Sequence, residues 1–231
     1  MILLLACATP TSDTAEPQGN GPTLSEVSYA VTWDAEGIER TVNGLEVRND
    51  LGWTFEVDEA WVVDRAWQLT ACEEELALVF PVWLGLARAG HGDDDVSVLT
   101  APVASDLIAD GTVHLDTVTF TDTAYCTVHV LSAYATSDTL GLPGDPDLVG
   151  YTLWIQGTAR RDDTTVELDL SSASADGALY DLPSGGYGGL DVHVTRSIAG
   201  LFDGVDPTND DAGRVALANL VDQQLVELTL R

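Results

Sequence analysis

Basic residues are scarce in this chain of 231 residues. Nine Lys and Arg residues stand against 38 Asp and Glu residues, which gives a formal net charge of -29 at pH 7. Such a charge repels the phosphates of nucleic acids and anionic lipid headgroups, so it argues against a nucleic-acid-binding protein. The general interpretation is a solvated acidic surface, and the more specific one is a surface that attracts divalent cations.

The sequence also lacks a long apolar run. No segment approaches the roughly 18 consecutive apolar residues that a membrane-spanning helix needs. We therefore expect the body of the chain to be a soluble domain. At 45% hydrophobic residues, it is long enough to bury a sizeable core as one unit.

The common catalytic motifs are missing as well. There is no Gly-x-Ser-x-Gly elbow, no His-Glu-x-x-His pair and no Gly-x-x-x-x-Gly-Lys phosphate loop. We expect a protein without catalytic activity, although a triad assembled in space from distant residues stays open because such triads leave no local motif.

Only three cysteines are present, and the first gives a prediction about location. Cys7 follows Leu4-Leu5-Ala6 and resembles the lipobox cysteine of bacterial lipoproteins, which is acylated and becomes the first residue of the mature chain. This resemblance implies an exported, lipid-anchored protein in the periplasm, on the outer membrane or on the cell surface of a Gram-negative bacterium. The apolar stretch Ile2–Ala6 is shorter than the usual 7 to 15 residues or so, so either the start lies upstream of Met1 or the match is accidental.

The segment after Cys7 predicts a tether. Residues 8–26 contain three prolines and two glycines and almost no large apolar side chains, so they cannot form a packed core. We expect residues 1–7 to be a truncated signal segment, 8–26 a flexible tether and 27–231 a single domain.

Cys72 and Cys126 remain as a pair. Both lie in alternating apolar runs, and export would favour a disulfide between two strands. Closing that loop would stabilise the fold by roughly 4 kcal/mol on a chain-entropy argument. The alternative is two buried thiols.

Alternation of apolar and polar residues predicts a mainly β protein. The clearest signal is a set of apolar residues at odd positions from Trp53 to Leu69, which includes three tryptophans and predicts one long strand or two in line. Many short strands with few helices favour an antiparallel β-sandwich of the Ig-like or Greek-key type. The expected strands are 27–33, 53–69, 113–120, 124–134, 151–159, 165–170, 190–195 and 224–230, and the expected short helices are 103–109, 198–202 and 211–222.

The four histidines provide candidate metal ligands. His129 and His193 alternate with valines on predicted strands, and His114 is followed two residues later by Asp116, so histidines on neighbouring strands could converge on a metal. The alternative is solvated strand histidines that never meet.

A glycine-rich loop offers a second kind of metal site. It combines His91 with Asp93, Asp94 and Asp95; Ca²⁺ would use the aspartates, whereas copper or zinc would favour the imidazole. The acidic loop 206–211 offers further oxygens without EF-hand spacing. For either loop, an ordinary solvated turn is the alternative.

Several short runs resemble a family of exported bacterial proteins, often lipoproteins and mostly uncharacterised. These runs are Gly150-Tyr151-Thr152-Leu153-Trp154-Ile155-Gln156-Gly157, Val192-His193-Val194-Thr195, Leu201-Phe202-Asp203-Gly204-Val205-Asp206 and Leu217-Ala218-Asn219. The pair Cys72 and Cys126 and the histidine loop between them are also similar to that family. More distantly, the Gly-Tyr-x-Leu strand is similar to the MbnP-like periplasmic copper-binding proteins, whose copper site uses histidines and an oxidised tryptophan.

The resemblance implies a β-rich periplasmic domain that binds copper. No residue of this chain matches the copper ligands of that family position by position, so His91, His129 and His193 are candidates on chemical grounds, with Trp67 or Trp154 nearby. Two other classes stay open: a calcium-stabilised extracellular binding or adhesion module, and a purely structural surface lipoprotein. The sequence does not identify a protein or small-molecule partner.

Lipidation of Cys7 is directly testable. We expect intact-mass and peptide mass spectrometry of protein isolated from cell membranes to find Cys7 as an acylated N-terminal residue. The matched variant Cys7→Ser should lose the lipid and leave the detergent phase on phase separation. An unmodified N-terminus in cells would contradict the prediction.

Overall fold

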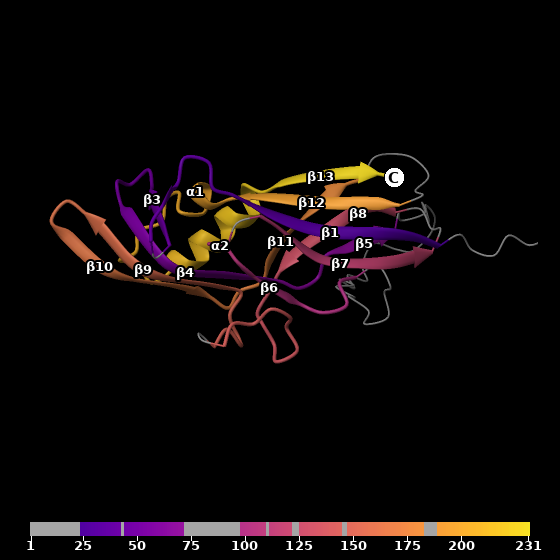
Figure 1. The fold of residues 1–231 in the computed structure, drawn as a ribbon, viewed down its shortest axis with the longest axis horizontal. Coiled ribbons are helices and arrows are strands. Elements are labelled where there is room, and N and C mark those ends of the chain that lie inside the picture. The colour runs from indigo at the N-terminus through magenta and orange to yellow at the C-terminus, as the bar shows by residue number, and fades with distance from the viewer. Residues whose placement is uncertain are drawn as a thin grey trace, which may run out of the picture.

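The chain folds as a mainly β protein built from two open sheets (Figure 1). The computed structural model describes residues 24–42, 44–71, 98–109, 111–121, 125–144, 147–182 and 189–231. The smaller sheet has the strand order β13-β12-β1-β7. Its strands are β1 (Leu24–Asp34), β7 (Thr112–Thr121), β12 (Leu190–Ser197) and β13 (Leu225–Leu230).

The larger sheet has nine strands among the described residues. Its main path is β10-β9-β4-β3-β2, and β8 attaches through β4 and pairs with β5 and β11, while β6 pairs with β4. The strands are β2 (Glu39–Arg40), β3 (Leu45–Arg48), β4 (Thr54–Asp64), β5 (Gln68–Ala71), β6 (Val103–Asp106), β8 (Tyr125–Ser132), β9 (Leu153–Arg161), β10 (Thr164–Ser172) and β11 (Asp176–Asp181).

Two short helices complete the described part of the fold. α1 (Ile198–Leu201) starts directly after β12, where the Ser197 hydroxyl accepts a hydrogen bond from the backbone N–H of Gly200. α2 (Ala212–Asp222) buries one face and contacts both β10 and β11. No helix in the described part of the chain is long and apolar enough to cross a membrane.

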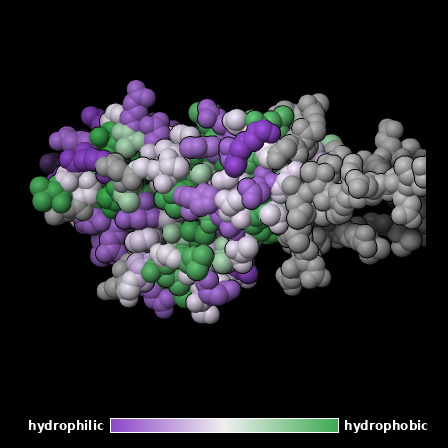
Figure 2. Space-filling model, turned by 45° about the vertical axis from the view of Figure 1, so that its right-hand side comes forward, coloured by the Kyte–Doolittle hydropathy of each residue, from purple (hydrophilic) through white to green (hydrophobic). Residues whose placement is uncertain are grey.

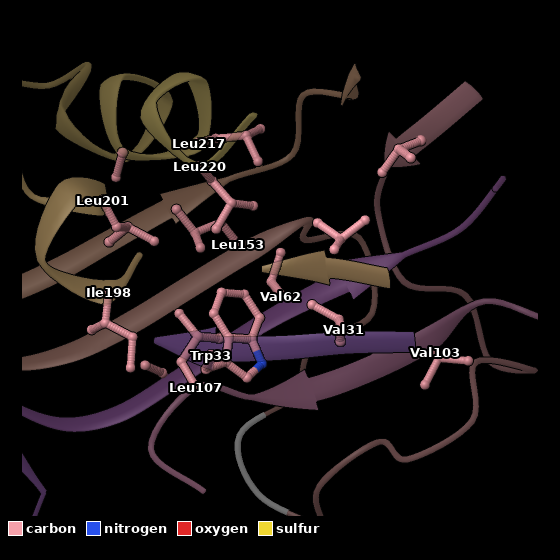
Figure 3. Packing of buried hydrophobic residues seen from close by; sticks show 14 of the residues in the cluster. Val31, Trp33, Val62, Val103, Leu107, Leu153, Ile198, Leu201, Leu217 and Leu220 are labelled. Atoms are coloured by element: carbon pink, nitrogen blue, oxygen red, sulfur yellow. The ribbon is translucent and has the colours of Figure 1, made fainter. Parts of the chain in front are cut away.

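The core lies between the sheets and under the helices. In Figure 3, Leu217 and Leu220 of α2 lie near Leu153 of β9, and Trp33 of β1 lies among apolar side chains from the sheets and from α1. The rings of Tyr29, on β1, and Trp67, directly before β5, meet edge to face with centroids 6.1 Å apart. The residues predicted to face inward on the first strand, Val27, Tyr29, Val31 and Trp33, are all buried.

The expected inner face of the 53–69 region is correct only in part. A β-bulge between Val57 and Glu59 shifts the pairing of β4 with β9 by one residue, which turns every later side chain of β4 to the opposite face. Ala60 and Val62 therefore face the main core, whereas Trp61 packs against a separate small cluster of Val63, Ala104, Ala135 and Leu148.

Other expectations also need correction. The helix expected at 103–109 is wrong, because Val103–Asp106 forms β6 and pairs with the second half of β4. The sandwich is not wholly antiparallel, since β1 pairs with β12 in parallel. β1 begins at Leu24, inside the segment expected to be tether, and β2, β3 and β11 had no counterpart in the sequence-based prediction.

A buried ion pair joins the two sheets. Arg196 projects inward from β12 and is 1% exposed, and Asp64 projects inward from β4 and is 0% exposed. Two hydrogen bonds connect them, from Nη1 to Oδ2 at 2.9 Å and from Nη2 to Oδ1 at 2.8 Å. This bidentate geometry is the strongest that arginine and a carboxylate form.

Neighbouring polar groups satisfy the rest of this pair. Ser132 Oγ donates to Asp64 Oδ1 at 3.1 Å and accepts from Arg196 Nη2, and Trp67 Nε1 donates to the same carboxylate oxygen at 3.2 Å. Arg196 Nε donates to Gln224 Oε1, and the guanidinium lies 5.5 and 5.6 Å from the ring centroids of Trp33 and Trp67. The charges are therefore buried without unpaired partners.

Removing one member of this pair should be costly. We expect Arg196→Met or Asp64→Leu alone to lower the free energy of unfolding by about 3 to 5 kcal/mol, because each leaves an uncompensated buried charge. The double variant should lose less than the sum of the two. Urea denaturation measures each loss, with Arg231→Met as the control, because the Asp191–Arg231 pair on the same sheet is exposed and should contribute less than about 1 kcal/mol. An equal loss in Arg196→Met and Arg231→Met would contradict the prediction.

Candidate functional site

The outer face of the smaller sheet aligns two histidines. The strand register places His193 of β12 opposite Ala30 of β1, and Ala30 opposite His114 of β7. His193 and Ala30 are half-buried and alternate with buried neighbours, and His114 is exposed. All three side chains therefore point away from the core, and the small Ala30 methyl separates the two imidazoles. We call these residues the histidine row.

Threonine hydroxyls hold both rings. Thr32 Oγ1 lies 2.8 Å from His193 Nε2 and 2.7 Å from Thr112 Oγ1, and Thr117 Oγ1 lies 3.1 Å from His114 Nε2. An Nε2–H that donates to a hydroxyl leaves Nδ1 with its lone pair. Orientation of an imidazole by a polar partner on its other nitrogen is the usual arrangement around metal-binding histidines.

The other proposed metal ligands do not join this row. His129 lies on β8 of the larger sheet, between the buried Val128 and Val130, so it points outward from the other sheet. His129 and His193 are therefore separated by the sandwich. His91 and the aspartates 93–95 lie outside the described residues.

No larger ligand cluster accompanies the row. Among the residues that the structure describes, no group of three or more His, Cys, Asp or Glu side chains is arranged to hold a metal ion. Glu227 of β13 is paired with His193 in the sheet register and is exposed. The row thus places two imidazoles and one carboxylate on the same outer face.

Of the three cysteines, only Cys126 lies among the described residues. Cys126 lies on β8, whereas Cys72 and Cys7 are outside the described residues. The disulfide and the lipid anchor both stay predictions. Of the two tryptophans considered near a metal, Trp67 is fully buried in the core beside Asp64, and Trp154 is half-buried, on the outer side of the larger sheet.

Asp116 is the most strongly hydrogen-bonded carboxylate near the row. Burial acts to raise its pKa, but hydrogen bonds from Thr100 Oγ1, Thr100 N and Thr117 N outweigh burial, and the pKa of Asp116 lies below its ordinary value. Asp116 is therefore an anion at neutral pH and adds to the negative potential on β7.

Two open grooves lie elsewhere on the surface. One, of about 430 Å³, runs between the outward face of β10 and the loop before α2; the other, of about 450 Å³, lies beside the turns that follow β3 and β9. The first is lined by Glu167, Asp169, Ser171, Pro207, Thr208, Asn209, Asp210, Ala212 and Gly213, and the second by Glu46, Arg48, Gly52, Thr54, Arg160, Arg161 and Asp162.

Neither groove selects a ligand class. The first groove includes part of the acidic loop 206–211. Its described carboxylates are not arranged as a group of three or more that could hold a metal ion. In the second, the Arg160 guanidinium pairs with Glu56, and Arg161 stacks on Trp53 with its guanidinium carbon 4.3 Å from the ring centroid. Two of its three arginines are thus committed to the protein itself. On the face in Figure 2, hydrophobic residues form small patches among hydrophilic ones.

The sequence reasoning missed the residues that the structure pairs. Arg196 continues the alternation of Leu190, Val192 and Val194, which was the signal that its side chain faces the core. The sequence associates His114 only with Asp116, because strand register cannot be obtained from one strand alone. No protein family model, curated protein or solved structure matches this chain.

The hydrogen bonds to Asp116 should make stability pH-dependent. A carboxylate whose pKa is depressed on folding stabilises the protein above its unfolded pKa, and this contribution is lost as pH falls through the folded pKa. We expect Thr100→Val to raise the pKa of Asp116 and to reduce stability at about pH 7 but hardly at about pH 2. Carboxyl ¹³C NMR titration measures the pKa of Asp116, and urea denaturation measures the stability. The control is Thr119→Val, which lies on β7 with Asp116. An unchanged Asp116 titration in Thr100→Val would count against this role of Thr100.

Proposed function

We propose that this protein is an exported, lipid-anchored β-sandwich of the Gram-negative periplasm or cell surface, and that it binds copper through the histidine row. The observation that carries the metal proposal is the alignment of His193 and His114 across Ala30 on one outward face. The export and anchoring part rests on the Cys7 motif and the tether composition.

A shared ion requires both imidazoles to turn toward Ala30, because the hydroxyls that hold their Nε2 atoms belong to Thr32 and Thr117 and lie on opposite sides of Ala30 along the strands. Neighbouring strands lie about 4.8 Å apart, so two imidazoles separated by one intervening strand start from Cα atoms roughly 10 Å apart. Each side chain covers part of that span, and the Ala30 methyl does not fill the space between them. A larger residue at position 30 would obstruct it.

The chemistry of the row favours copper over calcium. Imidazole nitrogen suits copper, zinc and nickel, and Cu²⁺ binds a given nitrogen site most tightly of the divalent first-row metals. The hydroxyls of Thr32 and Thr117 lie against the Nε2 atoms, and in the tautomer whose Nε2 donates, Nδ1 keeps the lone pair that a metal needs. Glu227 and a net charge of -29 raise the local concentration of cations.

Copper titration of the full chain tests the proposal. We expect His193→Ala and His114→Ala each to weaken Cu²⁺ binding at least about tenfold, equivalent to ~1.4 kcal/mol, with Ala30→Leu also weakening it. His129→Ala is the matched control, because it removes an outward strand histidine from the other sheet. Calorimetry gives the affinity, and electron paramagnetic resonance reports the nitrogen ligands.

The outcomes separate the alternatives. Copper binding that survives in the His114 and His193 variants but falls in His91→Ala or His129→Ala would contradict the proposal. It would indicate a copper site at His91 or His129 instead. A rise in melting temperature with Ca²⁺ that disappears when Asp93, Asp94 and Asp95 are neutralised would favour the calcium-stabilised module. No response to either metal would favour a structural lipoprotein.

A further inference from the structure

Three carboxylates lie near the histidine row, and they differ in their partners. Asp116 accepts hydrogen bonds from Thr100, and Asp191 pairs with Arg231. Glu227 of β13 is exposed, and no hydrogen bond or ion pair within the described part of the chain engages its carboxylate. Of these three carboxylates, Glu227 therefore has the oxygens that are uncommitted.

Glu227 lies directly opposite His193. β13 and β12 run side by side in the smaller sheet (Figure 1), and their register pairs these two residues. Directly opposite residues on antiparallel strands project from the same face with Cβ atoms about 5 Å apart. His193 thus has a carboxylate on the neighbouring strand, whereas His114 lies two strands away from β12.

The two side chains keep the lone pairs that a metal needs. Thr32 Oγ1 lies 2.8 Å from Nε2 of His193, and when Nε2 donates this hydrogen bond, Nδ1 keeps its lone pair. Glu227 accepts no hydrogen bond from His193 or from any other described residue. A cation that bridges Nδ1 and a carboxylate oxygen would bind both groups at once.

We propose that Glu227 is a direct ligand of copper at the histidine row, paired with His193, and that this oxygen ligand makes the site select Cu²⁺ over Cu⁺. This role rests on the copper proposal above, to which it adds a ligand and an oxidation state. Imidazole nitrogen with carboxylate oxygen is a donor set that suits Cu²⁺, whereas thiolate and thioether sulfur select Cu⁺. The four described strands of the smaller sheet contain no cysteine and no methionine.

Attraction of cations by the negative charge of Glu227 is the alternative role, and one substitution separates the two. Glu227→His removes the charge but presents a second imidazole directly opposite His193. Coordination by residue 227 predicts tight Cu²⁺ binding in this variant, because imidazole is also a good copper ligand. Attraction by charge alone predicts weak binding, as in Glu227→Gln.

Cu²⁺ titration of the full chain carrying Cys7→Ser, which removes the lipid site and a thiol, tests this role. Glycine is included as a competing ligand that suppresses weak surface sites. We expect Glu227→Gln to weaken Cu²⁺ binding about tenfold and Glu227→His to bind at least as tightly as the wild type. Glu26→Gln is the matched control, because Glu26 is an exposed carboxylate of β1 on the same outer face.

Two further readouts address coordination and oxidation state. Electron paramagnetic resonance should show one more nitrogen ligand in Glu227→His than in the wild type. Cu⁺ affinity, measured without oxygen against a coloured Cu⁺ chelator, should change less than about twofold in Glu227→Gln, because a carboxylate is a poor ligand for the softer ion.

Each result decides the proposal. An equal loss of Cu²⁺ affinity in Glu227→Gln and Glu26→Gln overturns it, and so does a Glu227→His variant that binds as weakly as Glu227→Gln. In either case the copper proposal itself stands if His193→Ala still weakens binding, and it falls as well if His193→Ala has no effect. Equal losses of Cu⁺ and Cu²⁺ affinity in Glu227→Gln overturn the selectivity. Melting temperatures without metal should match among the variants, which separates an effect on binding from an effect on folding.

Discussion

The contact between Arg196 and Asp64 is the interaction on which the arrangement of the two sheets depends. It is the point where β12 of the smaller sheet and β4 of the larger one meet through charged side chains, and both residues are fully buried. Apolar side chains between two sheets tolerate sliding, because dispersion and the hydrophobic effect have little directionality. A bidentate pair with Ser132, Trp67 and Gln224 around it has a defined geometry. We infer that this network selects one relative placement of the sheets, in addition to any stability that it contributes.

The same network explains where sequence-based reasoning succeeded and where it stopped. The mainly β sandwich, the strand of Val27 to Trp33 and the two C-terminal helices followed from apolar periodicity, because those elements alternate without interruption. Asp64 could not be placed in the same way, since the bulge near Asp58 reverses the inner and outer faces of β4. Two adjacent acidic residues, Asp58 and Glu59, interrupt the alternation there. That interruption was the visible sign that the phase changes.

The bulge has a structural counterpart on the neighbouring strand. Gly157 of β9 is paired with Val57, and a side chain there would come within 1.9 Å of the Glu56 carbonyl oxygen. Only glycine fits so close an approach of two backbones. The shift of register, the outward position of Trp61 and the inward position of Asp64 therefore depend jointly on β4 and β9. A single-strand analysis cannot reveal such a constraint, and it missed β6 for the same reason, because Val103–Asp106 is extended through its pairing with the shifted half of β4.

The candidate site illustrates a different limit. Alternation correctly placed His129 and His193 on outward faces, but which histidines share a face depends on sheet membership, which no local pattern encodes. The parallel pairing of β12 with β1 brings His193 to Ala30, and the antiparallel pairing of β1 with β7 brings Ala30 to His114. Three segments distant in sequence thus form one row, and the bulge in β7 lies directly beside it. Because of that bulge, Asp116 is paired with Tyr29 whereas His114 is paired with Ala30, and Asp116 binds the Thr100 segment instead of joining the row. The hydrogen bonds of Asp116 therefore keep this carboxylate committed to the Thr100 segment, so the outer face at the row presents the two imidazoles and Glu227.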